Sequence, residues 1–214
     1  MWTKITSFEL YRNNVHIFKS NKSRLTLALS NCHGPITKAN FNFATEAEDD
    51  TGVPHMLEHC IFLGSMLYNG KCLLDIASNL NYVIDTNAAT SQDNTSYSFE
   101  CSNFDGFLRI FNMYLDHFMA PFFEPNIYNT EVHAVDGEGI DIGVLYSEMS
   151  GKEKNIYRIL NRRTKKLLYG NNSYYSYNTG GMMNLIRSNN NFEKMKNFHK
   201  RFYHLDNLIF NCPK

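Results

Sequence analysis

The sequence contains one group of residues whose types and spacing point to chemistry, His55-x-x-Glu58-His59. On a helix, residues i and i+4 lie on one face about one turn apart, so His55 and His59 can converge on a single point. Neutral imidazole nitrogens at roughly 2.0–2.1 Å from a shared ion are a common way to hold Zn²⁺. Glu58 borders the same face without having to be a ligand, so it could reach a water on that ion. The motif therefore predicts a catalytic zinc site in which Glu58 is the general base.

The order of the motif is the reverse of His-Glu-x-x-His, which is typical of the inverted group of zincins. Two other interpretations are a chance match on an amphipathic helix and a closed structural zinc site. A closed site normally takes four protein ligands, often cysteines, and needs no carboxylate beside the ion. The five cysteines are widely spaced and form no Cys-x-x-Cys, so a thiol-rich site is not indicated. A third ligand downstream would favour the catalytic interpretation.

The candidates for that third ligand are His117, His133 and Glu148. His117 lies on an amphipathic segment and His133 near a loop, and both positions are typical of structural histidines. Glu148 lies on a predicted helix among residues that suit burial. A buried carboxylate needs a charge partner, and a zinc ion is one. The spacing alone supports a ligand role and a structural role for Glu148 equally.

The elements that must position these groups can be predicted from hydrophobic periodicity and turn residues. The motif helix begins near Pro54 and ends near Gly64. The other expected helices and strands are a strand over 7–19 with turn chemistry at Asn13 and Asn14, strands over 23–30 and 38–45, a helix over 71–80, strands over 83–90 and 95–101, a helix over 106–119 capped by Asn103, a helical stretch over 142–169 with a break near Gly151, helices over 182–186 and 192–203, and a strand over 207–211. Strands and helices mix without strict βαβ alternation, which predicts an α+β fold.

Composition excludes several classes of protein. The 214 residues are 43% hydrophobic, and 21 Lys and Arg balance 21 Asp and Glu, so the chain is globular and has no charge that favours nucleic acid or an anionic membrane. The basic run at 162–166 is more typical of a solvated helix face. An odd number of scattered cysteines indicates a reducing compartment. No apolar run is long enough to cross a membrane and the first residues lack a signal core, so we expect the cytoplasm, with the mitochondrion as the alternative.

The motif and the segment Val144-Leu145-Tyr146-Ser147-Glu148-Met149 together resemble the pitrilysin-type (M16) zinc metallopeptidases. The likeness is greatest to the presequence-protease-like branch and its cytosolic relatives. Residues 87–97 are similar to the strand next to the zinc in that family, and residues 130–139 to the approach to the distal glutamate. Residues 179–181 and 198–208 also fit, although Leu205 stands where the family tends to have proline.

The resemblance implies a role for each matching residue. His55, His59 and Glu148 would hold one Zn²⁺, and Glu58 would be the general base. Asn87 and Ala88 match the edge strand that pairs with the backbone of a peptide substrate. The family fold is a mostly antiparallel mixed sheet packed against helices.

The resemblance also implies partners. Residues 1–214 would be a single N-terminal peptidase domain of a longer chain, whose C-terminal half, or a related subunit, closes over the peptide. We therefore expect the isolated chain to be weakly active or inactive. The alternatives are a non-catalytic scaffold or partner subunit of the same family, whose members generally lose ligands, and a zinc-stabilised interaction module that does not need Glu58.

Overall fold

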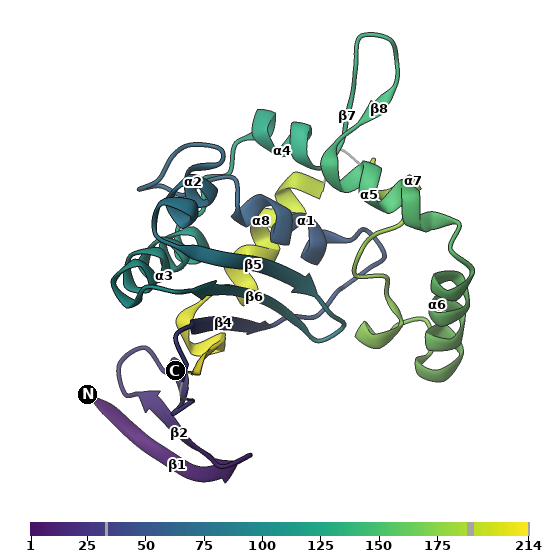
Figure 1. Ribbon diagram of the computed structural model, residues 1–214. Coiled ribbons are helices and arrows are strands. Elements are labelled where there is room, and N and C mark those ends of the chain that lie inside the picture. Colours follow the sequence, from purple (N-terminus) through teal and green to yellow (C-terminus); the bar gives the residue numbers. More distant parts are fainter. Residues whose placement is uncertain (33, 188–190, 214) are drawn as a thin grey trace.

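Within residues 1–32, 34–187 and 191–213, which the computed structural model describes, seven strands form one sheet with the order β1-β2-β3-β9-β4-β6-β5. Helices cover one face of its central strands (Figure 1). The strands are β1 (Trp2–Leu10), β2 (Asn13–Ser20), β3 (Thr26–Ser30), β4 (Thr37–Ala44), β5 (Val83–Thr90), β6 (Asn94–Cys101) and β9 (Leu208–Pro213). In this sheet β3 and β9 are parallel and the other neighbours are antiparallel. The predicted α+β class and the mostly antiparallel sheet are confirmed.

The helices alternate irregularly with the strands along the chain. They are α1 (Val53–Ile61), α2 (Leu73–Leu80), α3 (Phe104–Met119), α4 (Pro125–Glu131), α5 (Val144–Glu153), α6 (Ile156–Tyr169), α7 (Met183–Ile186) and α8 (Asn191–Phe202), with 3₁₀ turns at Tyr174–Ser176 and Leu205–Asn207. Along the part of the chain described, no helix is both long and apolar enough to cross a membrane.

The core lies between the central strands and the helices α1, α3 and α8. Alternate residues of β4 and β6 are buried, as period-two packing on a half-covered sheet requires, and Phe41 and Tyr97 are fully buried. Tyr114 of α3 stacks on Phe41 with ring centroids 5.6 Å apart. The buried side chains of the motif helix α1 belong to the same hydrophobic core as this aromatic layer.

Two glycines let the loop before α7 approach the start of α1. Gly52 has a left-handed φ of 80°, and a Cβ there would lie 2.5 Å from the backbone of Gly181. Gly181 also has a positive φ, of 86°. Because a side chain at Gly52 would clash with backbone, the close approach requires glycine there. It brings residues 176–183 beside the first turn of α1.

Two predictions about the N-terminal and central segments are wrong. The strand expected over 7–19 is a hairpin of β1 and β2, whose turn uses Tyr11 and Arg12 in the left-handed region with φ of 49° and 66°. The asparagines that follow pair with β1 instead of forming the turn. Two non-glycine residues in this conformation are uncommon, so the sequence favoured a longer strand.

The helical stretch over 142–169 is divided after Lys154 and not near Gly151. Asn155 begins α6 by accepting hydrogen bonds from the backbone N–H groups of Tyr157 and Arg158, which is N-capping by an asparagine side chain. Two elements that were not predicted lie between residues 119 and 144. They are α4 and the small hairpin of β7 (Ala134–Val135) and β8 (Asp141–Ile142), which projects beside α5 in Figure 1.

Candidate metal centre

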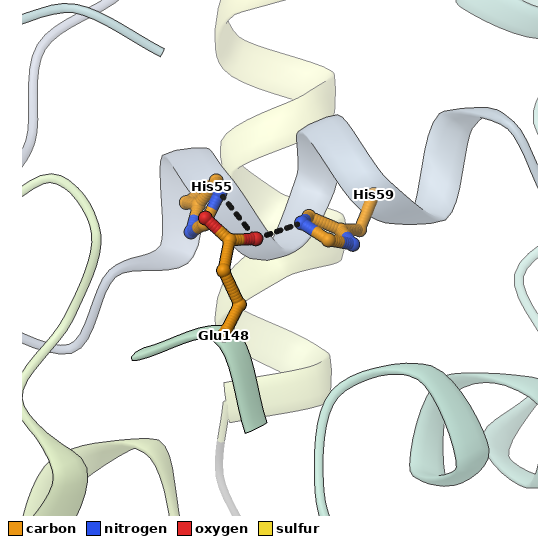
Figure 2. A group of neighbouring side chains, drawn as sticks. All are labelled: His55, His59 and Glu148. Carbon is orange, nitrogen blue, oxygen red and sulfur yellow. Dashed lines mark ion pairs between the residues drawn. The ribbon is translucent and has the colours of Figure 1, made fainter. Parts of the chain in front are cut away.

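Helices α1 and α5 bring three potential ligands to one point. His55 and His59 lie one turn apart on α1, and Glu148 reaches toward both from α5 (Figure 2). The Oε2 atom of Glu148 is 3.8 Å from Nε2 of His55 and 3.3 Å from Nε2 of His59. One ligand atom from each residue lies within 4.8 Å of the other two. Among the described residues, this is the one group of three or more such side chains that could hold a metal ion.

The spacing of these atoms fits a tetrahedral zinc ion. Two ligand atoms at about 2.1 Å from a common ion, in tetrahedral geometry, are about 3.4 Å apart. The two nitrogen-to-oxygen distances of 3.8 and 3.3 Å lie close to that value. Two imidazoles and one carboxylate are also the donor set of many catalytic zinc sites, which leave the fourth position open. The predicted group of His55, His59 and Glu148 is therefore assembled and suited to zinc.

Glu58 lies beside these ligands and is nearly buried, with 8% of its surface exposed. Its carboxylate accepts a hydrogen bond from the Thr90 hydroxyl at the end of β5. Burial raises the pKa of Glu58, and the bond from Thr90 opposes that shift without cancelling it. A carboxylate with a raised pKa is better matched to taking a proton near neutral pH than an exposed one.

Glu131, to which no role was assigned from the sequence, contacts one of the candidate ligands. Nδ1 of His59 donates to the Glu131 carboxylate over 3.0 Å, and Lys71 lies 3.6 Å from the other carboxylate oxygen. Glu131 is buried at the end of α4. A carboxylate on one ring nitrogen fixes the tautomer and directs the other nitrogen toward the metal. In the sequence Glu131 is a lone acid, which cannot be paired with His59 without the fold.

The electrostatics prepare the three ligands differently. Burial, and then the neighbouring His59, lower the pKa of His55 to about 4, so its imidazole is neutral at neutral pH. Burial also lowers the pKa of His59, but the hydrogen bond and charge of Glu131 outweigh it, and the net pKa is raised. For Glu148, burial opposes ionisation, yet the hydrogen bond from Lys152, its charge and the neighbouring imidazoles together lower the pKa. His55 and Glu148 are thus in their ligating forms, whereas Glu131 favours the protonated form of His59, and a proton on that ring competes with a metal.

A groove of about 590 Å³ opens over the three ligands and Glu58. Its walls are the end of β5, α5, α6 and residues 176–183. β5 is the terminal strand of the sheet, so the strand predicted to lie at an edge does so. Ala88 lines the groove, whereas Asn87 is exposed on the same strand and is not among the groove-lining residues.

The basic run at 162–166, predicted to be a solvated helix face, lies on a helix with no buried residue, and part of it also lines the groove. Arg162 and Lys165 line the groove, and Lys165 donates to the Gln92 side chain over 2.7 Å. Lys166 pairs with Asp50 at 2.9 Å. Because one side of α6 faces the groove, some basic side chains of this run form part of the groove wall.

The two isolated histidines have structural contacts, as interpreted from the sequence. Nδ1 of His117 donates to the backbone carbonyl of Met113 over 2.8 Å in the core. Nε2 of His133 donates to Asp141 over 2.8 Å, in the hairpin before α5. The candidate centre therefore does not include either of them.

Comparison with known proteins places these features in a family. A family model described as insulinase (peptidase family M16) matches residues 44–158. The chain is 37% identical over 193 residues to an uncharacterized protein of Caenorhabditis elegans, covering 90% of this chain and 19% of that one. It is 28% identical over 178 residues to the mitochondrial presequence protease of Xenopus tropicalis, covering 78% of this chain and 17% of that one.

The fold has a counterpart among solved structures. The crystal structure of pitrilysin superposes with a TM-score of 0.77 at 14% sequence identity, covering 99% of this chain and 22% of that one. The chain thus spans about one fifth of the length of the relatives that it matches.

Proposed function

This chain belongs to the insulinase-type peptidase family M16, and we propose that it hydrolyses peptide bonds with a zinc ion held by His55, His59 and Glu148. The observation that carries the proposal is the convergence of these three side chains beside a buried glutamate, at the floor of a groove. Ligands, an open coordination position and a nearby base are what a metal-assisted hydrolase needs.

Three residues beside the zinc ligands, Glu58, Thr90 and Glu131, each have a defined role in this reaction. Zinc, when bound, supplies a Lewis acid that lowers the pKa of water and polarises the scissile carbonyl. Glu58 takes a proton from the attacking water and passes it to the leaving amine, while the Thr90 hydroxyl fixes its carboxylate. Glu131 holds the ring of His59 in one orientation.

We propose that the substrate is an unfolded peptide that adds to the free edge of β5. A strand at the edge of a sheet presents unpaired N–H and C=O groups, which an extended peptide can pair with. The segment with Asn87 and Ala88 would bind the peptide backbone and lead it over Glu58, because Thr90 of the same strand contacts that carboxylate.

The relatives are about five times as long, so we propose that residues 1–214 act as one N-terminal peptidase domain of a larger enzyme. Further chain, or a related subunit, would close the groove and donate hydrogen bonds to the developing oxyanion. Such donors are worth roughly 10²–10³-fold each in rate. The chain alone would then turn over slowly.

We propose the cytoplasm as the compartment, with the mitochondrion as the alternative. Cys32, Cys60, Cys72 and Cys101 are free thiols, which fits a reducing environment. The mitochondrial alternative follows from the relatives that are named mitochondrial presequence proteases.

The test compares the zinc-loaded chain with its Glu58→Gln variant on an unstructured peptide, with products detected by mass spectrometry. We expect slow cleavage that falls by about 10²–10⁴-fold in the variant, because an acid–base group is lost. Zinc content should stay at about one per chain in both proteins, because no ligand changes. Loss of zinc in Glu58→Gln would make Glu58 a ligand. Bound zinc with no difference in cleavage would instead favour a scaffold of the same family.

A further inference from the structure

Helix α6 presents a row of cations to the groove. Arg158, Arg162 and Lys165 all line it, and their spacing of four and three residues places them on one side of the helix. No residue of α6 is buried, so the core does not require these side chains. They must be explained by the groove or by solvent.

Their neighbours leave two of these charges without a counterpart. Lys152 is paired with Glu148, and Lys165 is hydrogen-bonded to Gln92. The guanidinium groups of Arg158 and Arg162, in contrast, have no ion-pair or hydrogen-bond partner within the described parts of the chain. Two unpaired arginines in a concave wall are suited to bind a carboxylate, since the planar guanidinium matches its two oxygens.

The path of an extended peptide leads to these arginines. β5 ends at Thr90, and Gln92, just beyond it, bonds both to Lys165 of α6 and to the backbone carbonyl of Tyr174 at 2.6 Å. A peptide that follows the edge of β5 past Glu58 therefore meets α6. If it runs antiparallel to β5, its amino-terminal side faces the arginines.

We propose that Arg158 and Arg162 make the groove selective for peptides with an aspartate or glutamate on the α6 side of the scissile bond. The inference rests on the proposed function, because it assumes that peptides occupy this groove. Of the three carboxylates that line the groove, Glu58 and Glu148 belong to the candidate centre, and Glu153 is not within ion-pair distance of either arginine. An acidic side chain of the substrate would thus supply the charge that the wall lacks.

The experiment measures binding by fluorescence anisotropy, using the zinc-loaded Glu58→Gln chain so that the peptide is not consumed. A neutral unstructured peptide carries one glutamate that is moved along its length, and each version has a matched glutamine peptide. We expect one or two positions at which glutamate tightens binding by roughly tenfold, which corresponds to two partly exposed ion pairs. The preference should weaken as salt is raised.

The decisive variant is Arg158→Gln with Arg162→Gln, and its matched control is Arg163→Gln. Arg163 lies on the same helix but is exposed and does not line the groove. The double variant should lose the glutamate preference and keep the affinity for the glutamine peptide, whereas the control should keep both. The position of the preferred glutamate would also report the direction of the peptide on β5.

Three outcomes would overturn the inference: equal binding of matched peptides, an equal loss in the Arg163→Gln control, or no binding of either peptide. Parallel cleavage assays with the protein that retains Glu58 separate this proposal from the proposed function. A glutamate preference that depends on the arginines, with no cleavage of any peptide, would retain the inference and reject the hydrolase. Cleavage of the glutamate and glutamine peptides at the same rate would retain the hydrolase and reject the inference.

Discussion

The two helices that supply the candidate ligands are held by the fold in different ways. α1 carries Met56, Leu57 and Ile61, which are fully buried, and it packs against α8. α5 lies nearer the rim, where a third of the Glu148 side chain is exposed and its carboxylate pairs with Lys152. The next helix, α6, buries no residue at all. The two histidines are therefore carried by a helix of the core, and the glutamate by a helix nearer the rim, although all three side chains line the groove.

Because the two helices differ in this way, the centre combines a rigidly packed histidine helix with an open side that a substrate can reach. Close packing fixes the helix that carries the two imidazoles, because an interior has few voids and low compressibility. The rim keeps Glu148 ionised, since the pair with Lys152 helps to lower its pKa. The same openness lets a peptide reach the groove between β5 and α6.

We expect the largest change in zinc affinity from the loss of a histidine ligand on α1. Replacing His59 by alanine removes a ligand and the histidine to which Glu131 is hydrogen-bonded, so zinc affinity should fall by more than the roughly 10–100-fold that is typical of lost outer contacts. Zinc content after dialysis, measured by elemental analysis, checks this. His204→Ala is the matched control, because that histidine lies outside the centre and pairs with Asp206. Full zinc occupancy in His59→Ala would refute the assignment of the ligand.

The next effect compares the stability of the two regions. Leu57→Ala in α1 should lower the free energy of unfolding by about 2–5 kcal/mol, because it opens a cavity in a packed core. Leu160→Ala in α6 should change it by no more than about 0.5 kcal/mol, because that side chain is 61% exposed. Urea denaturation of both variants is the measurement. Similar losses would mean that another surface covers α6 in solution.

The same contrast explains how far the sequence could be interpreted. The α1 motif and its ligands could be predicted, because helical spacing alone brings His55 and His59 together. The central strands followed from alternating residues such as Phe41 and Phe43. Glu148 was ambiguous on spacing, since its approach to α1 depends on the packing of α5, and only the resemblance favoured it as a ligand.

Other features depended on contacts that no local pattern encodes. Glu131 acts across the space between α4 and α1, so a lone acid in the sequence could not be matched to His59. The basic face of α6 had the composition of a solvated surface, and its place in the groove depends on Gln92 and the loop after α6. The roles of Asn87 and Ala88 stay predictions.

We expect the smallest change in zinc affinity from Glu131, which is not a ligand but is hydrogen-bonded to His59. Glu131→Gln keeps the size of the side chain but removes its charge, so zinc affinity near pH 8 should weaken by about 10–100-fold. Glu138→Gln, in the exposed turn between β7 and β8, is the matched control and should leave the affinity unchanged. Competition with a chromophoric chelator measures the affinities.

The pH dependence of the same variant separates a charge effect from a structural one. Glu131 raises the pKa of His59, so the imidazole is protonated over a wider range and zinc affinity falls as the pH drops through that raised value. In Glu131→Gln the pKa of His59 should decrease, because the stabilising charge is gone while burial still disfavours the protonated ring. The pH below which zinc affinity begins to fall should therefore move downward, although the affinity above that pH is weaker. If Glu131 were only a packing residue, the variant would lose affinity equally at every pH, and a plot of log affinity against pH that is lowered but begins to fall at the same pH would exclude its electrostatic role.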